Sequence, residues 1–344
     1  MKPINTVLLS FGMSGKLFHA PFVHAHPGFR LHGVWERSKN LAVEIYPDIT
    51  TYRSLEEALA DREVELVIVN TPNATHFDYA VKALHAGKHA VVEKPFVVIT
   101  EEGFELEKIS KQKGLIVSPF QNRRWDSDFL TVKQVVDSGV LGEIVECAFH
   151  FDRFKRELSP KQHKEKPGPG TGALYDLGAH IIDQALHLFG MPQAVFADIR
   201  ILRSMSAVDD YFELLLYYDA LRVRLHCSYI TQEPLPAYSL HGTEGSFIKS
   251  RADRQEMDLQ NGVLPGRANW GLEPDEERGL LHTAKEGKRR IPTRQGDYMN
   301  YYNGIYSAIR QGTNPPGSVA DGINIIRIIE AAFQSHQEKR VISL

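Results

Sequence analysis

The chain has 344 residues, of which 42% are hydrophobic and 24% are charged, and its formal net charge at pH 7 is −3. These values are typical of a globular protein with a large core and about two domains. The charge provides no basic excess for nucleic acid or for an anionic membrane, and no apolar run approaches the roughly eighteen residues of a membrane span. We therefore expect neither nucleic acid nor a membrane as a partner.

Cysteine usage and the start of the chain both favour a cytoplasmic protein. The two cysteines, Cys147 and Cys227, are not part of a CxxC pair, so neither a disulfide framework nor a cysteine zinc site is expected. The apolar stretch before Leu9 is short and has no cleavage-site pattern, so it predicts a strand and not a signal peptide.

The first third of the chain alternates apolar runs with helical patterns. Strands are predicted at residues 6–9, 31–35, 65–69, 89–92 and 115–117, and helices at residues 14–24, 55–60, 75–86 and 100–113. Thr75 and Thr100 are candidate N-caps, and Gly87 and Gly114 are candidate C-cap glycines. This alternation predicts an α/β domain with a doubly wound parallel sheet and right-handed crossovers.

The pattern changes after about residue 121. Helices are predicted at residues 128–137, 174–188 and 318–337, and strands at residues 144–151, 195–202, 211–218, 221–229 and 238–241. Residues 155–172 form a basic loop, and residues 264–294 are predicted to be mostly loop. Because short turns join neighbouring strands, the pairing should be antiparallel, which indicates a second domain of α+β type.

A glycine loop directly follows the first strand. Its sequence resembles the dinucleotide fingerprint G-x-G-x-x-G, with Ser10 in place of the first glycine. Gly12 would let backbone approach a pyrophosphate, Gly15 would allow close packing of helix on strand, and the helix N-terminus would offer amides to phosphate. The predicted cofactor contacts in this loop are Phe11, Gly12, Met13, Ser14 and Gly15.

The second strand ends at an acidic residue, Glu36. Its distance from the glycine loop along the sequence is that of the residue that usually binds the adenine ribose. The carboxylate of Glu36 can accept hydrogen bonds from ribose hydroxyls, which favours NAD. Arg37 and Ser38 follow at once and could hold a ribose 2′-phosphate, which favours NADP. Because Glu36 favours one cofactor and Arg37 and Ser38 favour the other, the sequence leaves the choice open between NAD and NADP. The alternative for all three residues is a solvated loop that binds no ligand.

The next two strands also end in polar residues. Ligands of an open α/β sheet bind outside the carboxyl ends of its strands. Asn70, Thr71, Pro72, Asn73 and His76 follow one strand, and Glu93, Lys94 and Pro95 follow the other. Turn formation and helix capping explain Asn70 and Asn73 equally well. For Glu93 and Lys94, the alternative is a solvated turn.

With these motifs in place, the chain resembles the glucose–fructose oxidoreductase/inositol dehydrogenase (Gfo/Idh/MocA) family. The matching motifs lie at residues 10–15, 70–76, 86–89, 93–95 and 176–180, in the family's order over more than half of the chain. Residues 121–126 and 175–178 are similar to a branch that includes NADP-dependent scyllo-inositol dehydrogenases. The substitution at Ser10 departs from the family pattern in the pyrophosphate loop.

The resemblance implies a fold and an activity. It implies a Rossmann domain over residues 1–120 and an α+β domain over residues 121–344, whose large, mostly antiparallel open sheet often forms a dimer interface. The helix predicted at residues 318–337 could pack back near the first domain. The implied enzyme transfers a hydride between NAD(P) and a hydroxyl carbon of a cyclic polyol or sugar, and forms a homodimer or homotetramer.

One helix of the second domain carries the remaining candidates. Asp176, His180, Asp183 and His187 are spaced by four, three and four residues, so they share one helix face. A zinc site is disfavoured, because adjacent turns cannot bring all four to one ion, and no metal is expected. An amphipathic helix with one or two satisfied buried histidines is the alternative.

The family pattern assigns Asp176 and His180 to catalysis, and the chemistry of the reaction adds Lys94. Histidine titrates near neutrality and suits a base that takes the hydroxyl proton, while Lys94 could stabilise the charge that develops on the same oxygen. Lys94 should therefore meet His180 over the nicotinamide. Family position also suggests Asn122 or Arg123 near the nicotinamide or substrate, with a hinge role as the alternative. Asp152, Arg153 and Lys155 lie where substrate-facing residues could come from.

The sequence thus predicts an NAD(P)-dependent dehydrogenase that acts on CH–OH donors. A cofactor-binding sensor that has lost its chemistry is the first alternative, but it would have no reason to keep Lys94, Asp176 and His180 together. A metal-dependent hydrolase built on the Asp176/His180 face is the second, and it would leave the glycine loop unexplained.

Overall fold

The computed structural model describes residues 2–160 and 164–344, and the chain forms two compact units. The first unit comprises Met1–Asn122, Gln255–Trp270 and Asp297–Ile323, and the second comprises Arg123–Arg254, Gly271–Gly296 and Asn324–Leu344. The chain therefore passes between the units at several points, whereas the sequence suggested one boundary near residue 120. The division into a cofactor domain and a substrate domain stays a prediction.

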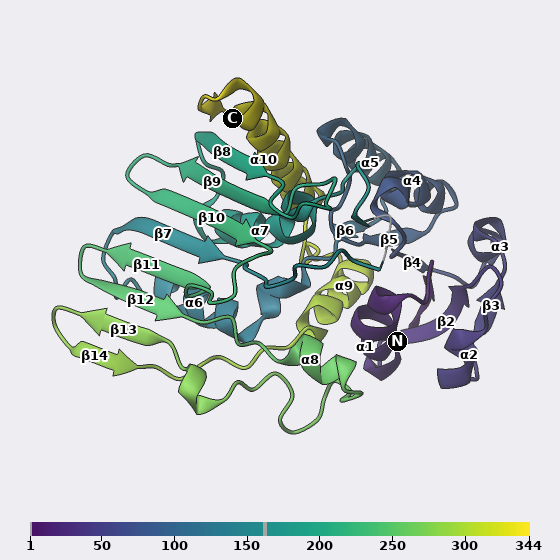
Figure 1. The fold of residues 1–344 in the computed structure, drawn as a ribbon. Coiled ribbons are helices and arrows are strands. Elements are labelled where there is room, and N and C mark those ends of the chain that lie inside the picture. The colour runs from purple at the N-terminus through teal and green to yellow at the C-terminus, as the bar shows by residue number, and fades with distance from the viewer. Residues whose placement is uncertain (1, 161–163) are drawn as a thin grey trace. The chain divides into compact units, whose positions relative to one another are not determined.

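The first unit contains a six-stranded parallel sheet in the order β3-β2-β1-β4-β5-β6 (Figure 1). Its strands are β1 (Ile4–Leu8), β2 (Phe29–Trp35), β3 (Thr50–Tyr52), β4 (Leu66–Val69), β5 (His89–Val92) and β6 (Val117–Pro119). β1 and β4 are buried along their whole length, as expected of parallel strands whose two faces are covered. The predicted doubly wound sheet is confirmed, although the short strand β3 was not predicted.

Helices connect these strands and complete the first unit. They are η1 (Gly15–His19), α1 (Ala20–Ala25), α2 (Leu41–Ile45), α3 (Leu55–Ala60), η2 (Asn73–Thr75), α4 (His76–His85), α5 (Thr100–Lys113), α8 (Gln255–Gln260) and α9 (Met299–Gln311). The sequence did not predict α2, α8 or α9. Gly114 ends α5 with a left-handed φ of 62°, as predicted, but the N-cap of α5 is Ile99, and Thr100 is already the first helical residue.

The second unit contains a nine-stranded sheet in the order β14-β13-β12-β11-β7-β10-β9-β8-β15 (Figure 1). Its strands are β7 (Ile144–His150), β8 (Ala194–Arg200), β9 (Tyr211–Tyr217), β10 (Arg222–Ser228), β11 (Tyr238–Gly242), β12 (Gly245–Lys249), β13 (Leu280–Thr283), β14 (Gly287–Arg290) and β15 (Ile342–Ser343). Only β7 and β10 pair in parallel; the other pairs are antiparallel, which confirms the predicted sheet.

Residues 264–294 are mostly loop, as predicted, but they also contain a hairpin that the sequence did not predict. β13 and β14 form a hairpin within that stretch, and β13 pairs with β12. β14 has the sequence Gly-Lys-Arg-Arg and is exposed throughout, so it lacks the apolar alternation by which a strand is recognised.

Helices pack on the sheet of the second unit. They are α6 (Ser127–Asp137), η5 (Leu174–Gly178), α7 (Ala179–Phe189) and α10 (Val319–Glu338), of which the part from Asn324 onward belongs to this unit. The short η6 (Asp275–Glu277) also belongs to the second unit, while η3 (Asn122–Trp125) lies where the two units join in sequence. Burial alternates along β8, β9 and β10, so one face of the sheet is packed and the other is more exposed. Within the described residues, no helix is both long and apolar enough to cross a membrane.

Candidate active site

The glycine loop of the first unit is fixed to the neighbouring strand by Ser10 and Asn70. The Asn70 side chain accepts the Ser10 N–H at 3.0 Å and donates to the Ser10 carbonyl at 2.9 Å, and the Ser10 hydroxyl donates to the Asn70 carbonyl at 2.7 Å. The serine that replaces the first fingerprint glycine therefore ties the end of β1 to the end of β4. The side chain of Asn70 is therefore used in hydrogen bonds to Ser10, and it holds the glycine loop in position.

The two glycines of the loop differ in their surroundings. A Cβ on Gly15 would lie 2.4 Å from the Ser10 carbonyl oxygen, so only glycine allows this approach of helix to strand. A Cβ on Gly12 would meet nothing closer than 3.9 Å, and Gly12 and Met13 are exposed. Phe11 is buried and packs edge-on against Tyr46. The loop thus presents open backbone at Gly12, which suits the close approach of a pyrophosphate.

Glu36 is engaged by the protein itself. It is 7% exposed, and its two carboxylate oxygens accept the N–H groups of Leu41 at 3.2 Å and of Ala42 at 3.0 Å, at the start of α2. Its carbonyl accepts a hydrogen bond from Arg53 at 2.9 Å. Arg37 and Ser38 are exposed, so this turn offers both side chains to a ligand.

His76 joins the loops that follow β4 and β5. Its Nε2 contacts the Thr71 carbonyl at 2.9 Å and its Nδ1 contacts the Pro95 carbonyl at 2.8 Å. Burial lowers the pKa of His76, while the two carbonyl contacts act in the opposite direction and offset this only in part. The predicted cofactor role of His76 stays a prediction, while its visible contacts position the backbone beside Lys94.

A buried network that sequence reasoning missed holds Glu93. His19 contacts Glu93 at 3.0 Å through Nε2 and the Tyr302 hydroxyl at 2.7 Å through Nδ1, and Tyr302 donates to the Phe18 carbonyl at 2.9 Å. Burial opposes the charge on Glu93, but the His19 contact and the nearby cations outweigh it and lower the pKa of Glu93. The only hint of this network in the sequence was His19, a polar residue among apolar neighbours in the predicted helix at residues 14–24.

Lys94 follows this network directly. Its N–H donates to Glu93 Oε2 at 3.1 Å, and the peptide bond between Lys94 and Pro95 is cis. Glu93 on one side and the His76–Pro95 contact on the other therefore fix the backbone that carries the lysine.

The catalytic candidates of the second unit lie on two consecutive helices. Asp176 is in the π-helical turn η5 and accepts a hydrogen bond from Lys164 at 3.0 Å. His180 is in α7 and is 6% exposed, and its ring lies 6.2 Å from that of Phe151. The glycine loop of the first unit also leads into a π-helical turn, η1, and such turns are frequent at functional sites.

The other two residues of this helix face have separate environments. Asp183 is buried and accepts two parallel hydrogen bonds from the Arg124 guanidinium, at 2.9 Å and 2.6 Å. His187 is exposed near the end of α7. Asp183 is therefore committed to holding Arg124, and the four residues do not act as one cluster.

The remaining predicted contacts lie where the units join in sequence. Asn122 is buried and is the last residue of the first segment of unit one. Arg123 begins the second unit, forms an ion pair with Asp126 at 3.3 Å and lies 5.3 Å from the Phe151 ring centroid. Lys94 belongs to the first unit and His180 to the second, so their predicted meeting stays a prediction.

Comparisons with known proteins define the class. Residues 4–121 match the model of an oxidoreductase family's NAD-binding Rossmann fold, and residues 133–344 match the model of its C-terminal alpha/beta domain. The chain therefore belongs to the Gfo/Idh/MocA family, and it is an NAD(P)-dependent oxidoreductase. The resemblance recognised in the sequence is confirmed.

Individual relatives cover the whole chain. The scyllo-inositol 2-dehydrogenase (NADP(+)) IolW of Bacillus subtilis is 39% identical over 99% of this chain and 96% of its own length. The uncharacterized oxidoreductase YdgJ of Escherichia coli is 36% identical over 99% of both chains. A solved structure from Bacteroides fragilis has a TM-score of 0.91 at 44% identity and covers both chains completely.

Proposed function

We propose that this protein interconverts a secondary alcohol and a ketone on a cyclic polyol of the inositol type. The similarity to IolW over nearly the whole of both chains carries this proposal, because IolW is named as a dehydrogenase of scyllo-inositol. The presence of Lys94, Asp176 and His180 at the matching motifs supports it.

In the direction of oxidation, His180 takes the proton of the substrate hydroxyl while a hydride leaves the carbon that bears this hydroxyl. Lys94 donates a hydrogen bond to that oxygen and stabilises the negative charge that develops on it. Asp176 accepts hydrogen bonds from neighbouring hydroxyls of the ring and so orients the carbon. The nicotinamide, when bound, accepts or returns the hydride.

The residues of the first unit fit a dinucleotide. The exposed backbone at Gly12, next to the tight packing at Gly15, forms an open cradle that a side chain would fill. The backbone of residues 11–15 would hold the pyrophosphate, and residues 70–73 and 93–94 would lie toward the nicotinamide.

We further propose that NADP is preferred to NAD. Both Glu36 oxygens already accept backbone amides at the start of α2, which weakens Glu36 as an acceptor for two ribose hydroxyls. Arg37 and Ser38 are exposed beside it and suit a 2′-phosphate, because a guanidinium and a hydroxyl both donate to its oxygens. IolW is named as an NADP(+) enzyme, which supports this choice.

A spectrophotometric screen at 340 nm tests the proposal. Both cofactors are combined with inositol stereoisomers and with aldoses, in both reaction directions. We expect turnover of at least one inositol, with a higher kcat/KM for NADP than for NAD. Turnover restricted to aldoses would refute the inositol class, and a preference for NAD would refute the assignment of Arg37 and Ser38.

A further inference from the structure

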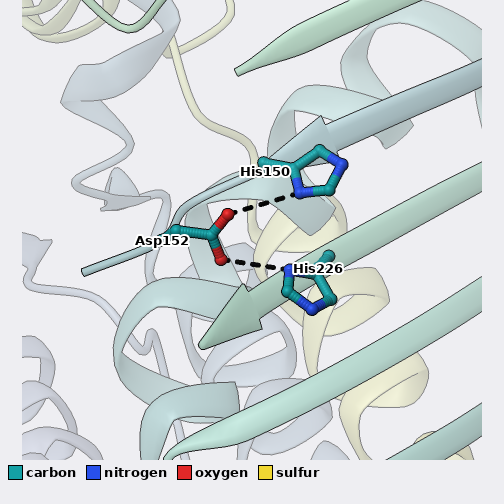
Figure 2. Close-up of side chains that lie close together, drawn as sticks. All are labelled: His150, Asp152 and His226. Carbon is teal, nitrogen blue, oxygen red and sulfur yellow. Dashed lines mark hydrogen bonds and ion pairs between the residues drawn. The ribbon is translucent and has the colours of Figure 1, made fainter. Parts of the chain in front are cut away.

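Two histidines and an aspartate meet on the sheet of the second unit, apart from the proposed catalytic residues. His150 ends β7, His226 lies in β10, and Asp152 follows β7 by two residues (Figure 2). The parallel register of β7 and β10 sets His150 directly beside His226. One donor atom from each of the three residues lies within 4.8 Å of the other two. We call these residues the His150 cluster.

The Asp152 carboxylate lies between the two imidazoles. Its Oδ1 is 3.0 Å from His226 Nδ1, and its Oδ2 is 3.4 Å from His150 Nδ1 (Figure 2). The Ser228 N–H donates to Oδ1 at 3.0 Å. Both histidines therefore direct the same ring nitrogen toward one carboxylate, whose orientation a backbone amide fixes.

One contact of the cluster is unsatisfied. Within the described residues, His150 Nδ1 is buried from solvent and has no hydrogen-bond partner, because its approach to Asp152 lacks hydrogen-bond geometry. A buried polar nitrogen without a partner destabilises the fold and requires an explanation. A cation between the two rings and the carboxylate would give this nitrogen a partner.

The composition of the cluster favours a transition metal over a shared proton. Two imidazole nitrogens and one carboxylate oxygen form a donor set typical of zinc with an open position for water. Within the described part of the chain, both ion pairs of Asp152 are with imidazoles, so no lysine or arginine neutralises it. The Ser228 amide acts as the outer hydrogen bond that commonly orients a ligating carboxylate.

We propose that the His150 cluster binds one zinc ion, through Nδ1 of His150, Nδ1 of His226 and a carboxylate oxygen of Asp152, with water completing the coordination. Phe151 lies between two of the ligands in sequence and is buried with its ring 6.2 Å from that of His180. Because successive side chains of a strand point to opposite faces, the zinc would lie on the face of the sheet away from His180. The ion would therefore link β7 to β10 and take no part in hydride transfer.

Zinc uptake by the full-length protein without an affinity tag tests this proposal. After dialysis against zinc and removal of weakly bound ion, we expect one zinc per chain by elemental analysis. His226→Gln, His150→Gln and Asp152→Asn should each lower the affinity by about 100-fold or more. His241→Gln is the matched control, since His241 lies on the adjacent strand β11, is exposed and contacts Ser246, and this variant should keep the ion.

Spectroscopy on the protein without substitutions tests the same site even if the variants do not fold. X-ray absorption at the zinc edge should show two imidazoles and oxygen donors, and cobalt in place of zinc should give the visible bands of a four- or five-coordinate site. Absence of stoichiometric zinc, uptake that survives His226→Gln, or a spectrum without imidazole would overturn the proposal.

Discussion

The candidate residues of the two units are held in different ways. In the first unit, the side chains at the strand ends bind mainly backbone: Asn70 holds Ser10, His76 holds the loops after β4 and β5, and Glu36 caps α2. In the second unit, the candidates lie on a helix and pair with other side chains, as Asp176 does with Lys164 and Asp183 with Arg124.

This difference indicates how each part would meet its ligand. The first unit uses its polar side chains to shape loops, so that backbone is left to contact a dinucleotide that is the same in every reaction. The second unit presents side chains themselves, which can change without altering the sheet. We therefore expect substitutions in the first unit to affect cofactor binding and those on the helix to affect turnover, with Lys94 as the exception.

The largest effect is expected for His180→Ala. Loss of the base should lower kcat by about 10²- to 10⁴-fold and remove the acidic limb of the pH–rate profile, because that limb reports protonation of the base. Measurement of kcat/KM against pH for the wild type and the variant tests this. His187→Ala, on the same helix but exposed, is the control, and an unchanged acidic limb in His180→Ala would exclude His180 as the base.

Lys94→Met should lower kcat by about 10²-fold or more while the Kd for the cofactor changes little, since the lysine would act on the reacting oxygen. Steady-state kinetics and cofactor titration by fluorescence measure the two quantities, with the exposed Lys82→Met as control. The double variant with His180→Ala should be less impaired than the product of the single effects, if both groups act on one oxygen. Near-normal turnover would exclude the catalytic role of Lys94.

A smaller effect is expected for Arg37→Ala. Loss of a guanidinium that binds the 2′-phosphate should raise the KM for NADP by about 10- to 100-fold, while the KM for NAD stays the same. Kinetics with both cofactors measure this change, and the exposed Arg62→Ala of the same unit is the control. Equal changes for both cofactors would mean that Arg37 does not recognise the phosphate.

The last prediction concerns stability and not turnover, and it involves Asp209, which supports the helix of the second unit. Its carboxylate accepts the Leu174 N–H at 2.8 Å, and burial raises its pKa from 3.8 to about 6. The folded state then binds the proton more tightly than the unfolded state, so this group's contribution to stability is present below about pH 4 and is lost as pH rises toward 6. Its size is roughly 3 kcal/mol, since each unit of pKa difference corresponds to about 1.4 kcal/mol.

Urea unfolding of the wild type and Asp209→Asn between pH 4 and pH 7 tests this prediction. The wild type should lose stability relative to the variant across that window, since asparagine can accept the same hydrogen bond without ionising. A difference between the two proteins that does not depend on pH would show that Asp209 does not titrate there. Glu93 provides the opposite case in the first unit, because its lowered pKa makes its contribution fade as the solution becomes acidic.

Most elements of the fold were predictable from local patterns, and the exceptions have local causes. β3 and α2 are short, with three and five residues, so they span too few residues for a period to emerge. α8 has six residues, four of which are Gln, Glu or Asp, so it lacks an apolar stripe. α9 has thirteen residues, but its buried face is rich in tyrosine, and its polar positions obscure the apolar stripe. β14 is fully exposed and charged.

The sequence by itself determined the class of fold and the family, and it predicted the positions of the chemically reactive residues. Strand–helix alternation, the glycine loop and the Glu93-Lys94-Pro95 turn are local features, so a single sequence can display them. Only the tertiary structure decided which polar side chains are committed to other parts of the protein. His19 and Tyr302 are 283 positions apart, and His150 meets His226 through strand register. Such partners are selected by long-range packing, which no local pattern encodes.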